Sequence, residues 1–426
     1  MEKYSVKDFI FMYLLFPFTL APMHSVQKGL YYTIVLFSLG ILFCKSTKCK
    51  FSKINLSWLF CFLSCFIILF FLTLFLPICY GTNDGSYTTK FIDYIIKYII
   101  ICVCALMFSD IDQFFLAYSK ATSLYVFFSL ILLIPSIRMG YMSLLPVSDE
   151  TNSHAQFLLA QGVLYYTRFG LQGFSGFEYT FRCSLAFIFL ICMLPRIKAK
   201  KEKKFLYFLL FINFLGCCLY GRVGILSCMM SVFVYILYIS IFEKDYRILF
   251  SIFVVIIFLI VTFLVLLDQI KENPTLAWMF EPFINLVETG KLSSSSSDGL
   301  KTMYIKISED TLLTGDGYYQ PNGKYYKGTD VGILRPLLFW GAGGSFIYYF
   351  CFLLLLIPIY NEIVYKETKV AKLLVLLLFM QNLLFEIKGE ANLAFIHILM
   401  GMNSVLLFKN ISRRKVFDIK KRLFIV

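Results

Sequence analysis

The chain has 426 residues, of which 59% are hydrophobic and 15% charged, and its mean hydropathy is +0.76. This composition excludes an ordinary soluble protein and indicates a single membrane domain that covers residues 1–426. The net charge of +14 does not indicate nucleic-acid binding, because Lys and Arg occur in short runs between apolar stretches.

Apolar stretches of about 18–25 residues recur along the chain, and each is long enough to cross a ~30 Å hydrocarbon core as a helix. They predict an all-α polytopic membrane protein with about twelve transmembrane helices. The first stretch is expected to be retained, not cleaved as a signal peptide, because many others follow it. The predicted spans are 9–23, 31–44, 54–79, 91–108, 114–135, 176–195, 205–219, 224–242, 248–267, 332–359, 373–387 and 391–408.

The basic residues predict the orientation of these spans. With the amino terminus inside, 24 of the 40 Lys and Arg residues fall in cytoplasmic segments and 12 in outer segments. Because membrane proteins keep positive charge on the cytoplasmic side, both termini are predicted to be cytoplasmic. Two outer loops are long, 136–175 and 268–331, and we expect any chemistry to take place there.

The second long loop contains a run of serines, 293–297, and then apolar side chains at helical spacing. This pattern predicts a flexible strap followed by a short amphipathic helix at the membrane interface, capped by Ser297 or Asp298. A plain solvated linker is the alternative. The apolar side chains are Leu300, Met303, Tyr304 and Ile307.

Motifs of soluble enzymes are absent, and no cofactor is predicted. The three histidines, His24, His154 and His397, are too scattered to form a metal site. Neither long loop contains any of the thirteen cysteines, so the cysteine pattern does not indicate a disulfide framework.

The candidate binding residues are arginines on or near the predicted outer face. A charge inside hydrocarbon costs roughly 2.5–3.5 kcal/mol on insertion scales, so such residues usually mark a polar pathway or a site. Guanidinium groups bind phosphate oxygens in bidentate fashion, which suits a diphosphate at the membrane surface. The four arginines are Arg168 in the first long loop, Arg182 in the next span, Arg222 in the turn 220–224, and Arg335 after the second long loop.

Each arginine also has a structural interpretation. Arg182 is four residues after Glu178 and can pair with it on one helix face. Arg168 can be an ordinary loop cation, Arg222 a headgroup anchor, and Arg335 an interfacial residue whose charge reaches toward water. By the same spacing argument, Lys97 and Asp93 are interpreted as a structural pair inside a span.

A glycine-rich segment ends the second long loop. Asp316 lies between two glycines and precedes Tyr318, and Asp330 is followed by Val331 and Gly332. Glycines permit tight turns that expose backbone donors, and carboxylates and tyrosines beside such turns commonly bind sugar hydroxyls. Asp330 or Asp316 is therefore a candidate for orienting an acceptor hydroxyl or acting as its general base, with Tyr318 as a substrate-binding residue.

In this order and at these topological positions, the motifs resemble those of the O-antigen polymerase (Wzy-type) family, which is related to the O-antigen ligases. The resemblance is carried by Arg168 with Gly170 and Gly173, by the turn 221–224, and by the segment 315–332 with the glycine-bearing span that follows. Ligases carry a histidine late in the second long loop, but residues 268–331 contain none, which favours a polymerase. Many relatives also have an arginine in the serine-rich stretch, where this chain has Asp298 and Lys301, so that role cannot be transferred.

The resemblance implies a GT-C-like, metal-independent glycosyltransferase of the bacterial inner membrane. Its substrates would be undecaprenyl-diphosphate-linked oligosaccharides, and its partners would be membrane lipids and a chain-length regulator. Arg168 and Arg222, together with Arg182 and Arg335, would bind the diphosphates. A lipid-linked oligosaccharide flippase or other secondary transporter is the alternative, followed by an O-antigen ligase. A flippase needs a polar cavity through the membrane, whereas here the polar residues gather at the predicted outer face.

Overall fold

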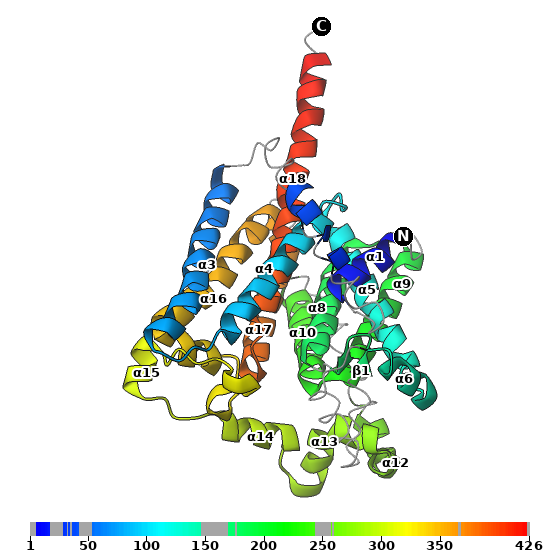
Figure 1. Cartoon of the computed structure of the whole chain (residues 1–426). Coiled ribbons are helices and arrows are strands. Elements are labelled where there is room, and N and C mark those ends of the chain that lie inside the picture. Colours follow the sequence, from blue (N-terminus) through cyan, green and yellow to red (C-terminus); the bar gives the residue numbers. More distant parts are fainter. Residues whose placement is uncertain are drawn as a thin grey trace. The chain divides into compact units, whose positions relative to one another are not determined.

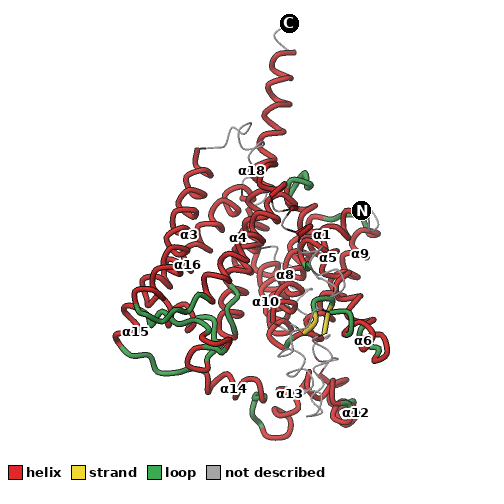
Figure 2. The backbone as a smooth tube through the Cα atoms, in the orientation of Figure 1, coloured by secondary structure: helices red, strands yellow, loops and turns green. Residues whose placement is uncertain are grey.

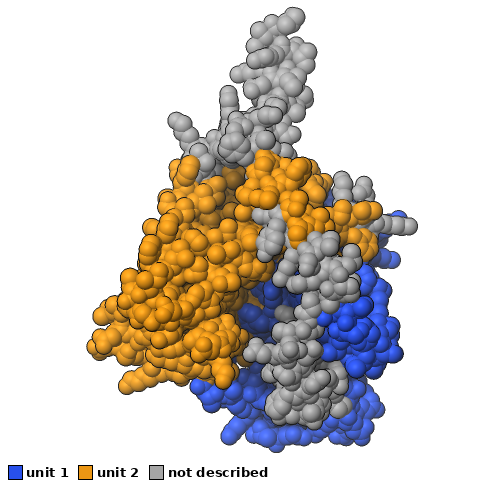
Figure 3. All heavy atoms as spheres, viewed as in Figure 1, with its two compact units in different colours: residues 1–4, 16–22, 119–302 blue, residues 5–15, 23–118, 303–426 orange. Residues whose placement is uncertain are grey.

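The computed structural model describes residues 6–17, 29–31, 33–34, 36–41, 53–145, 169–174, 177–242, 257, 260–364 and 368–423. Helices dominate both of its compact units (Figures 2 and 3). Unit 1 comprises residues 1–4, 16–22 and 119–302, and unit 2 comprises residues 5–15, 23–118 and 303–426.

Among the described residues, five helices are long and apolar enough to cross a membrane. Together with the composition, they indicate an all-α membrane protein. The predicted number of about twelve spans stays a prediction. Spans 9–23, 31–44 and 248–267 lie partly outside the described residues, and the helices at 91–108, 224–242, 373–387 and 391–408 are not among the five. The five segments are Ser57–Cys79, Ile111–Ile131, Phe177–Arg196, Lys200–Tyr220 and Leu334–Asn361.

In unit 2, helix α16 packs against three other long helices (Figure 1). Helix α4 presents Tyr87, Phe91, Tyr94 and Tyr98 at helical spacing, and this buried face explains its packing against α18. The helices of unit 2 are α1 (Val6–Leu15), α3 (Lys53–Cys79), α4 (Ser86–Ala105), α15 (Glu309–Thr314), α16 (Leu334–Val364), α17 (Thr368–Lys388) and α18 (Asn392–Leu423).

In unit 1, helix α8 is the core, because every residue from Tyr179 to Met193 is buried and it packs against α9 and α10. Helix α5 (Ile111–Ile131) begins in unit 2 and continues into unit 1. The other elements of unit 1 are α6 (Pro135–Met142), β1 (Phe169–Gly170), β2 (Gly173–Phe174), α8 (Phe177–Met193), α9 (Lys200–Tyr220), α10 (Arg222–Phe242), α12 (Leu267–Glu272), α13 (Pro274–Thr289) and α14 (Ser295–Met303).

The short strands β1 and β2 form an antiparallel hairpin within the first long loop. A Cβ atom on Gly170 would lie 2.3 Å from the hydroxyl of Tyr125, so the hairpin needs glycine there to pack against that ring. The glycine of the arginine-then-glycine motif thus has a packing role. Arg168 itself lies outside the described residues.

The second long loop is more helical than expected. The short helix predicted after the serines is present as α14, but the predicted strap and cap are wrong, because α14 already begins at Ser295. Ser294 and Ser297 bond to each other's backbone N–H at 2.8 and 3.2 Å, which forms a reciprocal cap before the first turn. Serines therefore start this helix instead of preceding it as a linker.

Helix α16 is broken at Gly341, where the backbone has φ 69° and ψ −171°. The N–H groups of Asp316 and Gly317 donate to the carbonyls of Leu338 and Phe339 at 2.6 and 3.3 Å, so the loop backbone donates hydrogen bonds to the helix. A Cβ atom on Gly341 would meet the carbonyl of Leu313 at 2.5 Å. The glycines predicted to allow close contact between helices instead admit a loop into a broken helix.

We expect Gly315→Ala to destabilise unit 2 by about 1–3 kcal/mol, because the backbone at Gly315 has φ 75° and ψ 173°. A Cβ atom there would also lie 2.3 Å from the carbonyl oxygen of Phe339. Unfolding in mixed detergent micelles would measure the loss. Gly299→Ala is the matched control, because nothing lies within 4 Å of a Cβ at that helical position. Equal stability of the two variants would contradict the role of Gly315.

Candidate anion-binding site

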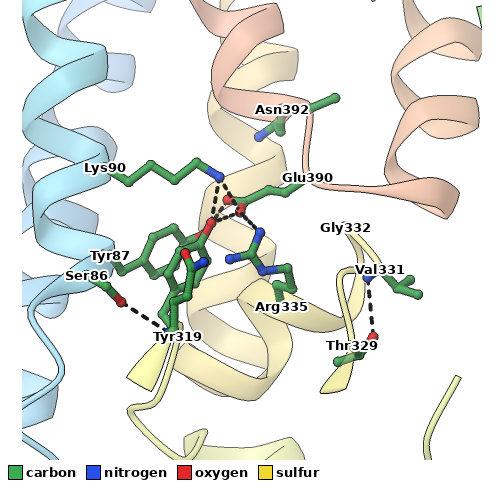
Figure 4. Close-up of polar contacts among 12 residues, drawn as sticks. Ser86, Tyr87, Lys90, Tyr319, Thr329, Val331, Gly332, Arg335, Glu390 and Asn392 are labelled. Atoms are coloured by element: carbon green, nitrogen blue, oxygen red, sulfur yellow. Dashed lines mark hydrogen bonds and ion pairs between the residues drawn. The ribbon is translucent and has the colours of Figure 1, made fainter. Parts of the chain in front are cut away.

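The described residues of unit 2 contain a buried charged cluster formed by four segments (Figure 4). Lys90 comes from α4, Tyr319 from the loop before α16, Arg335 from the first turn of α16, and Glu390 from the turn between α17 and α18. Lys90 Nζ lies 2.6 Å from Glu390 Oε2 and 2.6 Å from the hydroxyl of Tyr319, which itself donates to Glu390 Oε2 at 2.6 Å.

The carboxylate of Glu390 is enclosed, with its side chain 1% exposed. Its second oxygen, Oε1, accepts hydrogen bonds from the hydroxyls of Tyr87 and Tyr348 at 2.7 and 2.8 Å. Burial alone raises the pKa of Glu390, but Lys90 and Arg335 outweigh burial and lower the pKa to about 2. Glu390 is therefore ionised, and the cluster of Lys90, Arg335 and Glu390 carries one net positive charge.

Arg335 is held by aromatic rings more than by the carboxylate. Its guanidinium lies over Tyr319 and Tyr325, at 3.9 and 4.7 Å from the ring centroids. Behind Tyr319, the ring of Tyr87 stacks at 3.9 Å and nearly parallel, and Tyr87 in turn stacks on Trp340 at 4.6 Å. We call Arg335, Tyr319, Tyr87 and Trp340 the aromatic column.

As a result, Arg335 has N–H donors that make no hydrogen bond to the described residues. Its Nη1 lies 3.7 Å from Glu390 Oε2, too far for a hydrogen bond. Its Nε and Nη2 are buried and have no hydrogen-bond partner among the described residues. Because an unsatisfied buried donor on a cation is costly, this edge of the guanidinium is suited to an oxyanion, which it would bind with two parallel hydrogen bonds.

The turn between α3 and α4 positions Tyr319. Asp84 Oδ2 accepts the backbone N–H groups of Tyr319 and Gln320 at 2.7 and 2.8 Å, and Oδ1 accepts that of Ser86 at 3.0 Å. Burial raises the pKa of Asp84, but these hydrogen bonds outweigh it, so the pKa lies below its usual value. Asp84 is thus a charged support for the loop that carries the aromatic column.

Glu386, one turn before Glu390, has a structural role. Its Oε1 accepts the N–H groups of Ala391 and Asn392 at 2.6 Å each, and its Oε2 accepts the hydroxyl of Tyr349 at 2.7 Å. These contacts cap the start of α18 and fix the turn that contains Glu390.

The two predicted aspartates have different surroundings. Asp316 accepts hydrogen bonds from Thr311, Tyr326 and Lys327 at 2.7, 3.1 and 2.8 Å. Burial raises the pKa of Asp316, but the bonds from Lys327 and Thr311 outweigh it and lower the pKa, which makes Asp316 a weak base.

Asp330 has no such set of partners, since its Oδ1 is buried without a hydrogen bond to any described residue. Tyr318, the third predicted residue of this loop, stacks on Tyr326 with ring centroids 4.9 Å apart. Of the two carboxylates, Asp330 is therefore the one with a free acceptor.

The other predicted arginines belong to unit 1. Arg182 pairs with Glu178 on α8, as its spacing predicted, and its guanidinium lies 4.7 Å from the ring centroid of Phe16. Arg222 pairs with Glu281 of α13 and lies 4.7 Å from the ring centroid of Trp278. Unit 1 thus has two arginines with internal counter-ions, and unit 2 has Arg335.

Lys90, Tyr319, Tyr325 and Glu390 were not predicted as site residues. The available signal was position, because Lys90 and Glu390 each lie at the outer end of a predicted span, where a charge can be functional. The described residues hold no group of three or more His, Cys, Asp or Glu side chains arranged to bind a metal ion.

Comparisons of the chain with protein-family models, curated proteins and solved structures find no match.

Proposed function

We propose that this protein is an O-antigen or related surface-polysaccharide polymerase, with a GT-C-like fold of about twelve spans. It joins undecaprenyl-diphosphate-linked oligosaccharide repeats on the outer face of a bacterial cytoplasmic membrane. The observation that carries the proposal is Arg335, a buried cation held by tyrosine rings with two nitrogens free to bind an oxyanion. A lipid diphosphate is the anionic group that such a substrate presents at the membrane surface.

Two further observations support this function. Three segments predicted to lie outside the membrane, 80–90, 268–331 and 388–390, contribute residues to the cluster around Arg335. The glycine segment that resembles the polymerase family, 315–332, also leads directly into α16 and Arg335. The resemblance and the geometry therefore point to the same part of the chain.

In the proposed reaction, the hydroxyl of the acceptor repeat attacks the anomeric carbon of the growing chain. A new C–O bond forms, the bond from that carbon to the diphosphate oxygen breaks, and undecaprenyl diphosphate leaves. Arg335 stabilises the charge that develops on the leaving diphosphate. Asp330, with its unpartnered Oδ1, orients the acceptor hydroxyl and accepts its proton.

The proposal includes three further diphosphate-binding residues, Arg168, Arg182 and Arg222. Arg222 and Arg182 already pair with Glu281 and Glu178, so a diphosphate would have to displace or share these carboxylates. The polymerisation itself uses no metal ion in this proposal.

Purified protein in proteoliposomes, given a defined undecaprenyl-diphosphate-linked repeat, should produce a ladder of longer lipid-linked chains and free undecaprenyl diphosphate. The ladder should persist in EDTA, because guanidinium groups take the place of a metal at the diphosphate. Protein-free liposomes are the control. Transfer of intact single repeats across the bilayer without chain growth would instead support the flippase alternative and contradict the proposal.

A further inference from the structure

The free edge of Arg335 is not open to solvent. Nε and Nη2 are both buried, and the whole residue is 9% exposed. An anion can therefore reach these nitrogens only after part of the protein moves. We define the tyrosine loop as residues 318–328. This loop places aromatic rings against Arg335, and much of it lies at the protein surface.

The tyrosine loop has two limbs, 318–320 and 321–328, which are held differently. The first limb is fixed, because Asp84 accepts hydrogen bonds from the backbone N–H groups of Tyr319 and Gln320. The second limb carries Tyr325, which is 46% exposed although its ring lies 4.7 Å from the guanidinium of Arg335. Arg335 thus contacts one ring that is fixed and one ring that lies at the protein surface.

The polar side chains of Tyr326 and Lys327, in the second limb, both bond to one carboxylate. Asp316 Oδ2 accepts the hydroxyl of Tyr326 at 3.1 Å and Lys327 Nζ at 2.8 Å. The backbone bond between the limbs, from Tyr326 N to Tyr319 O, is long at 3.4 Å. The backbone N–H groups of Gly323, Lys324 and Gly328 donate only to carbonyls three residues earlier, so they form local turns. An exposed segment with mostly local hydrogen bonds opens at a low cost in free energy.

The second limb also contains backbone in the left-handed region. Gly328 has φ of 69°, and the non-glycine residues Asn322 and Lys327 have φ of 53° and 52°. Left-handed backbone at non-glycine residues is strained and persists only where neighbouring contacts hold it. For Lys327 the holding contact is its ion pair with Asp316.

We propose that Tyr325 is a hinged cover over the guanidinium group of Arg335 and that Asp316 is the latch that keeps it closed. The inference rests on the proposed function, because it concerns access of the substrate's diphosphate to that site. In the closed state the ring of Tyr325 shields Arg335 from water. When the contacts of Tyr326 and Lys327 with Asp316 break, the second limb swings out and the oxyanion reaches Nε and Nη2 of Arg335.

The cover gives Asp316 a role different from catalysis. Asp316 acts on the entry of substrate through Tyr326 and Lys327, without contact with the reacting atoms. It is a positioning residue, and its removal should change the rate at which an anion reaches Arg335. The strength of binding should change less, because the donors on Arg335 are untouched.

The test uses the full chain in nanodiscs, with inorganic pyrophosphate as the probe. The chain has three tryptophans, so Trp58→Phe and Trp278→Phe leave Trp340 as the sole reporter, stacked on Tyr87 in the aromatic column. Stopped-flow fluorescence should then give an association rate that is about tenfold higher for Tyr325→Ala than for the parent. Asp316→Asn should raise the rate in the same direction, and Tyr325→Phe, which keeps the ring, should not.

Two controls separate the cover from the site beneath it. Tyr207→Ala removes a tyrosine that is 55% exposed on α9 and should leave the rate unchanged. Arg335→Gln should abolish the fluorescence response. If that response survives, the anion site fails, and the proposed function loses the observation that carries it.

If Arg335→Gln abolishes binding but Tyr325→Ala and Asp316→Asn both keep the parental association rate, the cover is overturned while the proposed function stands. Hydrogen exchange keeps the test decisive should either variant fold poorly. In the parent, pyrophosphate should increase amide exchange in residues 318–328 relative to 309–314, and unchanged exchange would contradict the opening.

Discussion

Replacing Glu390 with alanine should lower the free energy of unfolding by about 3–5 kcal/mol, the loss expected when one partner of a buried ion pair is removed. The side chain of Glu390 is 1% exposed and is the counter-ion of both Lys90 and Arg335. Its loss would leave two neighbouring cations without a carboxylate. The hydroxyls of Tyr87, Tyr319 and Tyr348 would lose their acceptor as well.

Titration with a denaturing detergent would measure this loss. The matched control is Glu288→Ala, which removes the same side chain from an exposed ion pair with Lys271 and should cost less than about 1 kcal/mol. Glu390→Gln should fall between the two, because the amide still accepts hydrogen bonds but does not neutralise the cations. A Glu390→Ala protein as stable as the Glu288→Ala protein would show that the cluster does not stabilise unit 2.

Replacing Arg335 with glutamine should reduce the rate of polymerisation by about 10²–10³-fold, the usual effect of removing one group that stabilises a developing anion. The fold should survive, because Lys90 lies 2.6 Å from Glu390 and still neutralises it, whereas Arg335 lies 3.7 Å away. Cells with this variant should accumulate single lipid-linked repeats, and the purified protein should give a shortened product ladder.

Arg335→Lys should recover part of the activity, since it restores the charge without the two parallel donors. Lys301→Gln is the control, because Lys301 is a highly exposed cation in the long loop that precedes Arg335. Full-length polymer from Arg335→Gln at the parental rate would remove Arg335 from the mechanism and leave the function without its main structural support.

Local patterns explain what could be predicted from the sequence. Long apolar segments predicted the helices because the bilayer requires a run of apolar residues, and the spacing of four residues correctly paired Glu178 with Arg182 and Asp93 with Lys97. Both kinds of pattern depend on neighbours within one helix. These predictions are therefore independent of how the helices pack against one another.

The cluster around Arg335 could not be predicted for the same reason. Lys90 contacts Tyr319 and Glu390, which are 229 and 300 residues away along the chain. No hydropathy or spacing rule joins such positions, because their contact is set by the packing of α4, α16 and α18. Arg335 was identified by its charge, but its aromatic support and its free donors appear only in three dimensions.

Asp316 and the serine run illustrate a second limit. A carboxylate between two glycines is typical of many loops, and only its contacts with Thr311, Tyr326 and Lys327 indicate a latch instead of a base. Serine-rich composition favours flexible linkers, but Ser294 and Ser297 use the same hydroxyls to cap a helix. In each case the sequence indicates the chemistry of the side chain but does not identify the residue that it bonds to.

The break in α16 also determines how this helix is held against the second long loop. A continuous apolar helix can slide or tilt along the bilayer normal to match the thickness of the lipid around it. Here the loop backbone at Asp316 and Gly317 is bonded to carbonyls within the helix, and the hydroxyls of Tyr80 and Thr82 join the α3–α4 turn to the same loop. These hydrogen bonds fix the position of Arg335 relative to the loop and the α3–α4 turn, so a thinner or thicker bilayer should leave the geometry around this cation unchanged.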